Sequence, residues 1–185
     1  ANRNANDGIS MVQTAEGGLD EVSNILTRLR ELAIQSASDT VGDTERGFTD
    51  MEYQNLKQEV ERIAESTEFN SIKLLSGQGG ALDFQIGVGN DQFQDRLTYD
   101  TTMQNAKVDS LGITELAVNN KEGAQNSLDV IDNAIEKVSG QRASLGAIQN
   151  RLISTSNNLQ ITNENLSAAN SRIRDVDYAQ VSAAN

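Results

Sequence analysis

The sequence predicts a mainly α-helical fold: an elongated, coiled-coil-like bundle of long helices with a small β-hairpin. Apolar residues recur at heptad spacing toward both ends of the chain, and a short middle stretch alternates apolar with polar residues. Hydrophobic residues make up only 37% of the 185 residues and aromatic residues only 4%, below the usual share of a globular chain. This composition favours an elongated shape with much surface, packed by aliphatic side chains, over a compact enzyme.

The first predicted helix follows from a seam of apolar residues that recur at alternating steps of three and four. Such a seam is typical of a helix that buries one face against a partner helix. Ile25, Leu32 and Ile34 widen the apolar face toward a second buried side. The seven members of the seam are Val12, Ala15, Leu19, Val22, Leu26, Leu29 and Ala33.

The start of this helix and its glycines indicate a modest intrinsic stability. Asn6 or Asp7 is the predicted cap, because a short polar side chain accepts hydrogen bonds from the unpaired amides of a first turn. Gly17 and Gly18 each lower helix stability by about 1 kcal/mol relative to Ala. We therefore expect tertiary packing to hold this helix in place.

A second helix is predicted over about residues 44–66, after a turn rich in small polar residues at 38–47. Asp43 or Thr44 is its predicted cap. The loop at 67–80 is expected to tuck apolar side chains against both helices. The predicted apolar side of the helix consists of Phe48, Met51, Leu56, Val60 and Ile63, and the loop contributes Phe69, Ile72, Leu74 and Leu75.

Period-two alternation then predicts a β-hairpin within residues 76–120. The turn sequence Gly-Asn-Asp-Gln at 89–92 separates the two strands. The remainder, about residues 102–120, has little pattern and is expected to connect the hairpin to the last helix. The alternating residues are Leu82, Phe84, Ile86 and Val88 on the outgoing strand, and Leu97, Tyr99 and Thr101 on the return strand.

The last helix is predicted to begin near Lys121, and a leucine, isoleucine or valine falls at every seventh position of its seam. At a rise of 1.5 Å per residue, about 50 residues span on the order of 75 Å. We expect the two shorter helices to cover only part of this length. The seam consists of Ile131, Val138, Leu145, Leu152, Leu159, Leu166 and Ile173.

A companion row, four residues after each seam position, is apolar at Ile135 but changes to Arg142 and then to amides and hydroxyls. Three interpretations stay open: a change without consequence, buried polar residues that fix the register, or a surface that awaits another chain. Solvated polar faces on a long helix are the simplest of these. Because both ends read as interrupted helical patterns, we expect a portion of a longer protein and favour the third interpretation.

Composition excludes several classes of function. The net charge of −12 provides no basic patch for nucleic acid or for an anionic membrane surface. Without cysteine or histidine the chain lacks the commonest general base and soft metal ligands, and we expect no cofactor. No apolar stretch is long enough to span a bilayer, and no signal peptide is recognisable. Asp175 and Asp177 would face apart on a helix, and the glycine-rich stretch at 77–80 lacks the Lys of a P-loop, so no catalytic site is predicted.

Three stretches of the chain resemble the bacterial flagellin family. Residues 4–40 include RLRELAIQ and resemble its amino-terminal core, and residues 59–75 resemble its second helix and the loop that follows. Residues 141–179 include LGAIQNR and resemble its carboxy-terminal core. The three stretches occur in the order of the family, and only the middle, about residues 80–120, is individual.

The resemblance implies that residues 1–185 form the D1 rod of a flagellin, the extracellular subunit of the bacterial flagellar filament. The rod would comprise helices and a loop at 1–75, the hairpin and connecting segment at 76–120, and the long helix at 121–185. Other flagellin subunits are the implied partners, and export without a cleaved signal peptide is the implied route. The segments that form the inner D0 tube of the family are not recognisable here, so we expect these 185 residues alone to be monomeric. A free-standing coiled-coil adaptor and a hook–filament junction protein are the alternatives.

The resemblance also implies a receptor site. Vertebrate Toll-like receptor 5 recognises a D1 surface in many flagellins, centred on the helix that bears RLRELAIQ. From the residues alone, Leu32 also suits helix packing, and Arg28 with Glu31 also suits a solvated ion pair. The residues that match the receptor motif are Arg28, Glu31, Leu32 and Gln35, with Glu52 on the second helix as a further position.

Overall fold

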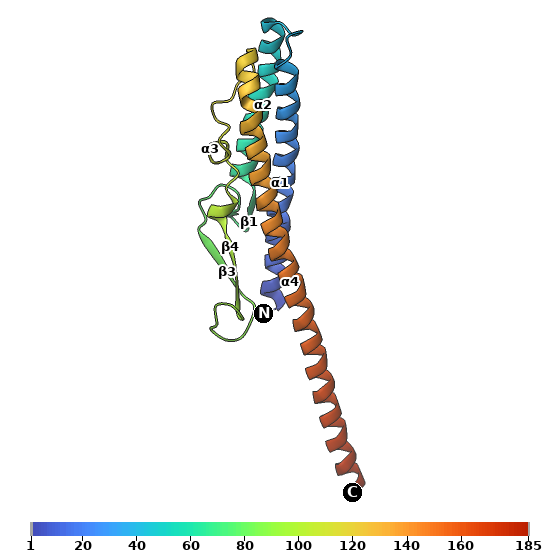
Figure 1. Cartoon of the computed structure of the whole chain (residues 1–185). Coiled ribbons are helices and arrows are strands. Elements are labelled where there is room, and N and C mark those ends of the chain that lie inside the picture. The colour runs from blue at the N-terminus through green and yellow to red at the C-terminus, as the bar shows by residue number, and fades with distance from the viewer. Residues whose placement is uncertain (1, 185) are drawn as a thin grey trace.

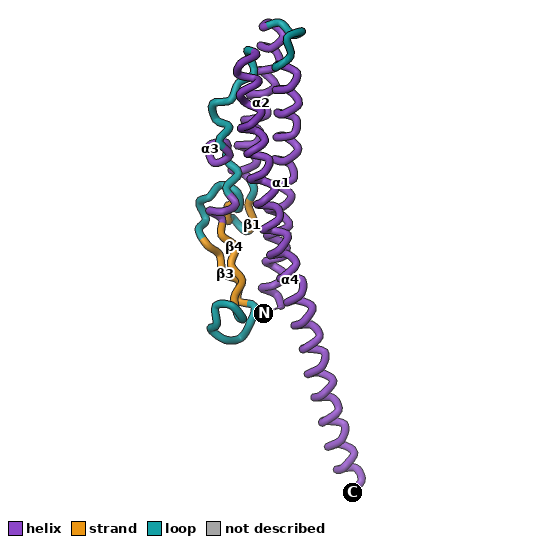
Figure 2. The backbone as a smooth tube through the Cα atoms, in the orientation of Figure 1, coloured by secondary structure: helices purple, strands orange, loops and turns teal. Residues whose placement is uncertain are grey.

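The computed structural model describes the backbone of residues 2–184 and the side chains of residues 3–172. It confirms the predicted fold class, a rod of long helices with a small antiparallel hairpin on one flank (Figures 1 and 2). The three long helices are α1 (Asn2–Ser36), α2 (Asp43–Ser66) and α4 (Lys121–Ala184). The elements between α2 and α4 are β1 (Glu68–Phe69), β2 (Ile72–Lys73), β3 (Ala81–Gln85), β4 (Arg96–Asp100), the 3-10 helix η1 (Thr101–Gln104) and α3 (Val108–Leu111).

The packing of α1 against α4 forms the axis of the rod. The two helices are antiparallel, because side-chain contacts between them run in opposite order along the two sequences. These contacts join Arg30 to Asp132 (2.7 Å), Glu16 to Arg142 (2.8 Å) and Asn6 to Ser156 (3.2 Å). Since α4 is far longer than α1, it continues beyond the amino-terminal end of its partner (Figure 1).

The seam predicted for α1 is confirmed. All seven of its members, from Val12 to Ala33, are fully buried, and Leu32 is buried with them. Two predictions for this helix are wrong. Ile34 is 49% exposed, and α1 already includes Asn2, so that Asn6 and Asp7 lie within the helix and do not cap it.

The apolar side predicted for α2 is correct in its second half and wrong in its first. Val60 and Ile63 are buried and Leu56 partly so, whereas Phe48 and Met51 are 68% and 64% exposed. Heptad geometry explains the difference, because residues that follow one another at steps of three, four or seven share a face whether they are polar or apolar. The buried residues of α2 are Arg46, Tyr53, Lys57, Val60, Ile63 and Ala64.

Arg46 belongs to the buried face because it caps the preceding helix. Its Nε donates a hydrogen bond to the carbonyl of Ser36 and an Nη donates to the carbonyl of Ser38, both at 2.7 Å. The last carbonyls of a helix have no intrahelical partner and carry partial negative charge, so a cation is favourable there. Asp43, the first residue of α2, forms an ion pair with Arg46, with 2.8 Å between Asp43 Oδ1 and Arg46 Nη1. The predicted caps of α2 are therefore wrong, and Gly42 occupies the cap position.

The predicted hairpin is confirmed as β3 and β4, which pair with Leu82 opposite Tyr99 and Phe84 opposite Leu97. Its connection is longer than the expected four-residue turn: residues 86–95 form the loop, and Val88 lies there fully exposed. A second hairpin, formed by the two-residue strands β1 and β2, was not predicted. Asn70 and Ser71 join its strands with φ of 50° and 66°, the left-handed conformation that tight hairpin turns require.

Polar side chains of α2 fasten the poorly patterned connecting segment to the bundle. Lys57 Nζ donates to the carbonyls of Thr114 (2.7 Å) and Leu116 (2.9 Å). The backbone N–H of Val118 donates to Asp50 Oδ1 (2.8 Å). Burial lowers the pKa of Lys57, an effect that Asp50 partly opposes. These bonds satisfy backbone groups of the segment that regular structure leaves unpaired.

The seam of α4 is buried over its first half and uncovered beyond. Ile131, Val138, Leu145 and Leu152 are buried, Leu159 is half-buried, and Leu166 is 59% exposed. The side chain of the last predicted member, Ile173, lies outside the described residues.

The companion row was assigned to the wrong register. Ala134 and Gln141, three residues after a seam position, are buried, whereas Ile135 and Arg142, four residues after, are only partly covered. The start of α4 near Lys121 is confirmed, and Asn120 caps it by accepting a hydrogen bond from the N–H of Gly123 (2.7 Å).

The two adjacent glycines of α1 provide a matched test of the packing. A β-carbon at Gly18 would lie 2.8 Å from both Leu75 Cδ1 and Thr67 Oγ1, whereas no atom lies within 4 Å of one at Gly17. We therefore expect Gly17→Ala to raise the free energy of unfolding by about 1 kcal/mol, the difference in helix propensity. We expect Gly18→Ala to lower it, because Leu75 is buried and cannot move freely. Urea titration followed by circular dichroism measures both; an equal gain in the two variants would contradict the packing of the loop on α1.

Candidate interaction surfaces

Three of the five residues predicted for the receptor site come together on one exposed surface of α1 and α2. Arg28 Nε donates to Glu52 Oε1 (3.1 Å), and Arg28 Nη1 donates to Glu31 Oε2 (3.2 Å). The hydrogen bond to Glu31, and then those to Glu52, raise the pKa of Arg28. All three side chains are about half exposed. The structure therefore joins a residue of α2 to two of α1, an arrangement that spacing within one helix does not show.

The other two predicted receptor residues are placed differently from each other. Gln35 is exposed one helical turn beyond Glu31. Leu32 is only 2% exposed and belongs to the hydrophobic core with Leu29 and Ala33. Leu32 therefore supports this surface from inside and is not available for direct contact in this conformation.

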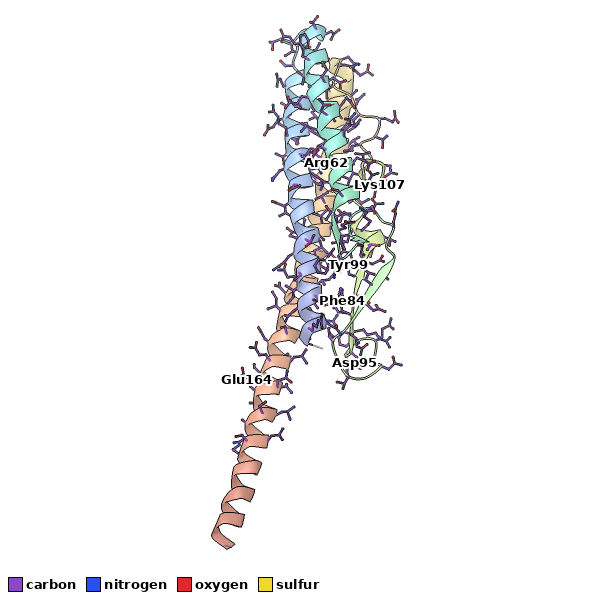
Figure 3. All side chains as sticks on the ribbon, turned by 180° about the vertical axis from the view of Figure 1, so that it is seen from behind. Arg62, Phe84, Asp95, Tyr99, Lys107 and Glu164 are labelled. Atoms are coloured by element: carbon purple, nitrogen blue, oxygen red, sulfur yellow. The ribbon has the colours of Figure 1, made fainter. Side chains whose placement is uncertain are left out.

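The second surface is residues 153–171 of α4, which begin beside the first turns of α1, where Ser156 contacts Asn6, and continue past its first described residue. Figure 3 shows it as a single helix, with Glu164 on it beyond the end of the bundle. Residues 153–171 contain one charged side chain, Glu164, and otherwise mostly Asn, Ser, Thr, Gln and Ala. Three large apolar side chains are exposed on it: Ile153, Ile161 and Leu166. Among the described residues this part of α4 is therefore largely without cover.

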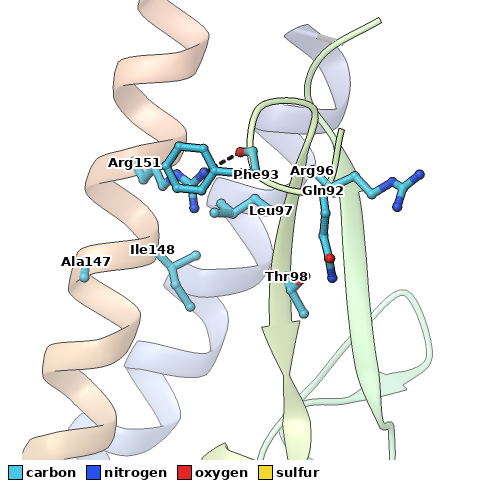
Figure 4. Close-up of a pocket in the computed structure, with 8 residues that line it drawn as sticks. All are labelled: Gln92, Phe93, Arg96, Leu97, Thr98, Ala147, Ile148 and Arg151. Atoms are coloured by element: carbon cyan, nitrogen blue, oxygen red, sulfur yellow. Dashed lines mark hydrogen bonds between the residues drawn. The ribbon is translucent and has the colours of Figure 1, made fainter. Parts of the chain in front are cut away.

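A shallow groove between the hairpin and α4 forms the third surface (Figure 4). Leu97 and Ile148 form its apolar part, and Arg151 lies at its end. Arg151 Nη2 donates to the carbonyl of Phe93 (2.9 Å), and its guanidinium carbon lies 5.2 Å from the centroid of the Phe93 ring. A cation over an aromatic face is attracted by the ring, so this pair attaches the hairpin loop to α4. The groove contains no paired carboxylates and no nucleophile beside a base.

Other chemistry finds no support in the described part of the chain. No group of three metal-ligand side chains lies close enough there to hold an ion, and none of the helices in that part is long and apolar enough to cross a membrane. The glycine-rich stretch at 77–80 leads into strand β3, as the sequence indicated. The side chains of Asp175 and Asp177 lie outside the described residues.

The fold defines a class of protein: an elongated α-helical rod with a small β-hairpin on one flank. The chain belongs to the bacterial flagellin family. Residues 1–79 match the bacterial flagellin N-terminal helical region, and residues 128–184 match the bacterial flagellin C-terminal helical region. Flagellins are structural proteins and not enzymes.

Individual relatives agree with this assignment. The flagellin of Halalkalibacterium halodurans is 41% identical over 97% of this chain and 65% of its own length. The flagellar filament core protein flaB2 of Brachyspira hyodysenteriae is 40% identical over 98% and 67%, and the flagellin of Bacillus subtilis is 39% identical over 97% and 69%. The chain thus spans about two thirds of the length of the curated relatives it matches.

Solved structures give the same result for the fold. The crystal structure of Bacillus cereus flagellin aligns with a TM-score of 0.76 at 31% identity, over 91% of this chain and 95% of that one. A putative flagellar hook-associated protein from Vibrio parahaemolyticus aligns with a TM-score of 0.71 over 90% and 87%, but at 15% identity it shows a shared fold alone.

Arg28 and Leu32 differ in burial, so substitutions at the two positions should change the stability of the rod by different amounts. We expect Leu32→Ala to lower the free energy of unfolding by about 2–5 kcal/mol, because it leaves a cavity in the core. We expect Arg28→Ala to leave stability nearly unchanged, since exposed ion pairs contribute little. Thermal melts of the two variants measure this difference. Equal, small effects would mean that Leu32 is not packed as described.

Proposed function

We propose that this chain is the D1 rod of a flagellin, a structural subunit that polymerises with other copies into the extracellular filament of the bacterial flagellum and so serves motility. The observation that carries the proposal is the α4 surface beyond Leu152, where the apolar seam continues with Leu159 half-buried and Leu166 59% exposed in the described chain. Exposed apolar side chains in such a row are favourable when another protein covers them. The names of the relatives, flagellin and flagellar filament core protein, support the same function.

Finer parts of the proposal follow from family membership. The rod comprises residues 1–75, 76–120 and 121–185 as helical, hairpin and long-helix parts, and export proceeds without a cleaved signal peptide. The 185 residues alone stay monomeric. Light scattering of the 185-residue chain reports its state directly.

Two other functions fit the shape less well. A hook–filament junction protein has the support of a shared fold with a hook-associated protein, but only at 15% sequence identity. The flagellin relatives are 39–41% identical, which favours a filament subunit. An adaptor that functions as a free-standing coiled coil is not expected to belong to the flagellin family. The match of both ends of the chain to that family therefore argues against this function.

The two halves of the α4 seam test the proposed filament role. We expect Leu166→Asp to block polymerisation of the full gene product and to leave the melting temperature of the 185-residue chain unchanged, because Leu166 is 59% exposed there. Leu152→Asp should instead unfold the rod, since it buries an unpaired charge at a cost above about 4 kcal/mol. Sedimentation and electron microscopy measure polymer. Ser167→Asp adds the same charge on another exposed face and serves as control; normal filaments from Leu166→Asp would contradict the proposal.

We also propose that the surface of Arg28, Glu31 and Glu52 binds vertebrate Toll-like receptor 5. Support comes from the resemblance to the receptor motif and from the position of these three side chains on one exposed face, with Gln35 nearby. In this proposal Leu32 acts by supporting the backbone of α1. Arg28 then provides the specific contact, as a planar cation with several donors.

A receptor reporter assay tests this surface. We expect Arg28→Ala to lower the response of a Toll-like receptor 5 reporter at least about tenfold, which corresponds to 1.4 kcal/mol of binding free energy. Arg30→Ala is the matched control, because Arg30 lies two residues away and pairs with Asp132 on the α4 side. Equal responses from the two variants, or silence of the unaltered chain beside an active agonist, would refute the proposal.

A further inference from the structure

A small apolar cleft lies where the two hairpins meet α1. Its walls come from α1, from the β1–β2 hairpin and from strand β3, and its volume is about 230 Å³. Both hairpins contact α1, so the helix forms the shared floor between them. The apolar side chains that line the cleft are Met11, Phe69, Ile72, Leu82 and Phe84.

Packing against the core holds these walls in place. Met11 is only 2% exposed, and the other four apolar side chains are partly buried against the core. The ring of Phe84 lies against α1, because a β-carbon at Gly8 would be 3.5 Å from Phe84 Cδ1, and Figure 3 shows Phe84 beside this helix. Side chains anchored in this way need little rearrangement to accept a ligand, so the cleft is largely preformed.

Two carboxylates also line the cleft. Asp7 extends from α1 and Asp83 from β3, and both are exposed. Asp83 accepts a hydrogen bond from Thr98 Oγ1 at 2.6 Å. Among the described residues neither carboxylate forms an ion pair. The cleft therefore combines apolar walls with negative charge that no basic side chain offsets.

We propose that this cleft binds a small organic amine that carries an aromatic ring on a short chain. The ring packs on Met11 and on the side chains of Phe69 and Phe84, since aromatic and thioether groups make favourable contacts with aromatic rings. The ammonium group donates charge-assisted hydrogen bonds to Asp7 and Asp83. This binding activity does not depend on the proposed filament function.

Charge and size select this ligand over others. An anion would be repelled by the two carboxylates, and a neutral apolar molecule would displace their water without replacing the lost hydrogen bonds. The volume lies below the range of about 300–1,000 Å³ that drug-sized ligands occupy, so one ring with a short chain is the appropriate size. The net charge of −12 also raises the concentration of cations near the surface.

The three methionines allow a direct test by NMR of the full gene product with carbon-13 in its methionine methyl groups. We expect phenethylamine to shift the Met11 methyl signal saturably, with a dissociation constant on the order of 1 mM, as suits so small a ligand. Met51 and Met103 are exposed elsewhere and serve as internal controls. Phenylethanol, phenylpropionate and methylamine, which lack the charge, reverse it or lack the ring, should each bind at least about tenfold more weakly.

A matched pair of double variants tests the carboxylates. Asp7→Asn with Asp83→Asn should leave the melting temperature nearly unchanged, because both side chains are exposed, and should weaken phenethylamine binding at least about tenfold. Asp109→Asn with Asp129→Asn removes the same charge from exposed positions on α3 and α4 and should preserve binding.

Three results would each overturn the amine site. One is the absence of a saturable shift at Met11, and another is a shift of equal size at all three methionines. The third is equal affinity of the two double variants. None of these results bears on whether the full gene product forms filaments.

Discussion

The antiparallel seam between α1 and α4 is the constraint on which the rest of the structure depends. Its apolar side chains exclude water only where both helices are present, and α1 has 35 residues against 64 in α4. In the described chain Leu152 is therefore a core residue and Leu166 a surface residue, although the same repeat places both. One heptad pattern thus builds the core, and in the proposed function it also supplies a surface for neighbouring subunits.

Polar side chains hold the parts of the chain that the α1–α4 seam does not contact. Arg46 closes the end of α1, and Lys57 with Asp50 holds the connecting segment against α2. Each of these groups is bonded to backbone atoms or to an opposite charge, so its burial is compensated. Because the chain has few aromatic residues, small aliphatic side chains and specific hydrogen bonds together stabilise its fold.

Periodic segments were the part that could be predicted best. Every member of the α1 seam is buried, and the β3–β4 hairpin has its predicted alternation, because a regular repeat determines which face of a helix or strand turns inward. Phe48 and Met51 were assigned to the core because they are apolar, whereas Tyr53 and Lys57 occupy it. Apolar character alone does not reveal which face of a helix packs inward. Polar residues occupy the inner face when they find hydrogen-bond partners there.

By itself the sequence determined the three long helices, the hairpin and the heptad seams, and through its resemblance to known motifs it determined the family. These follow from local spacing, which the chain carries at every position. Only the tertiary structure decided that Leu32 lies inside while Arg28 reaches Glu52, and that the described α4 seam changes from buried at Leu152 to half-buried at Leu159 and exposed at Leu166. Burial is a property of the neighbours that a residue meets in space, and these come from parts of the chain that are distant in the sequence.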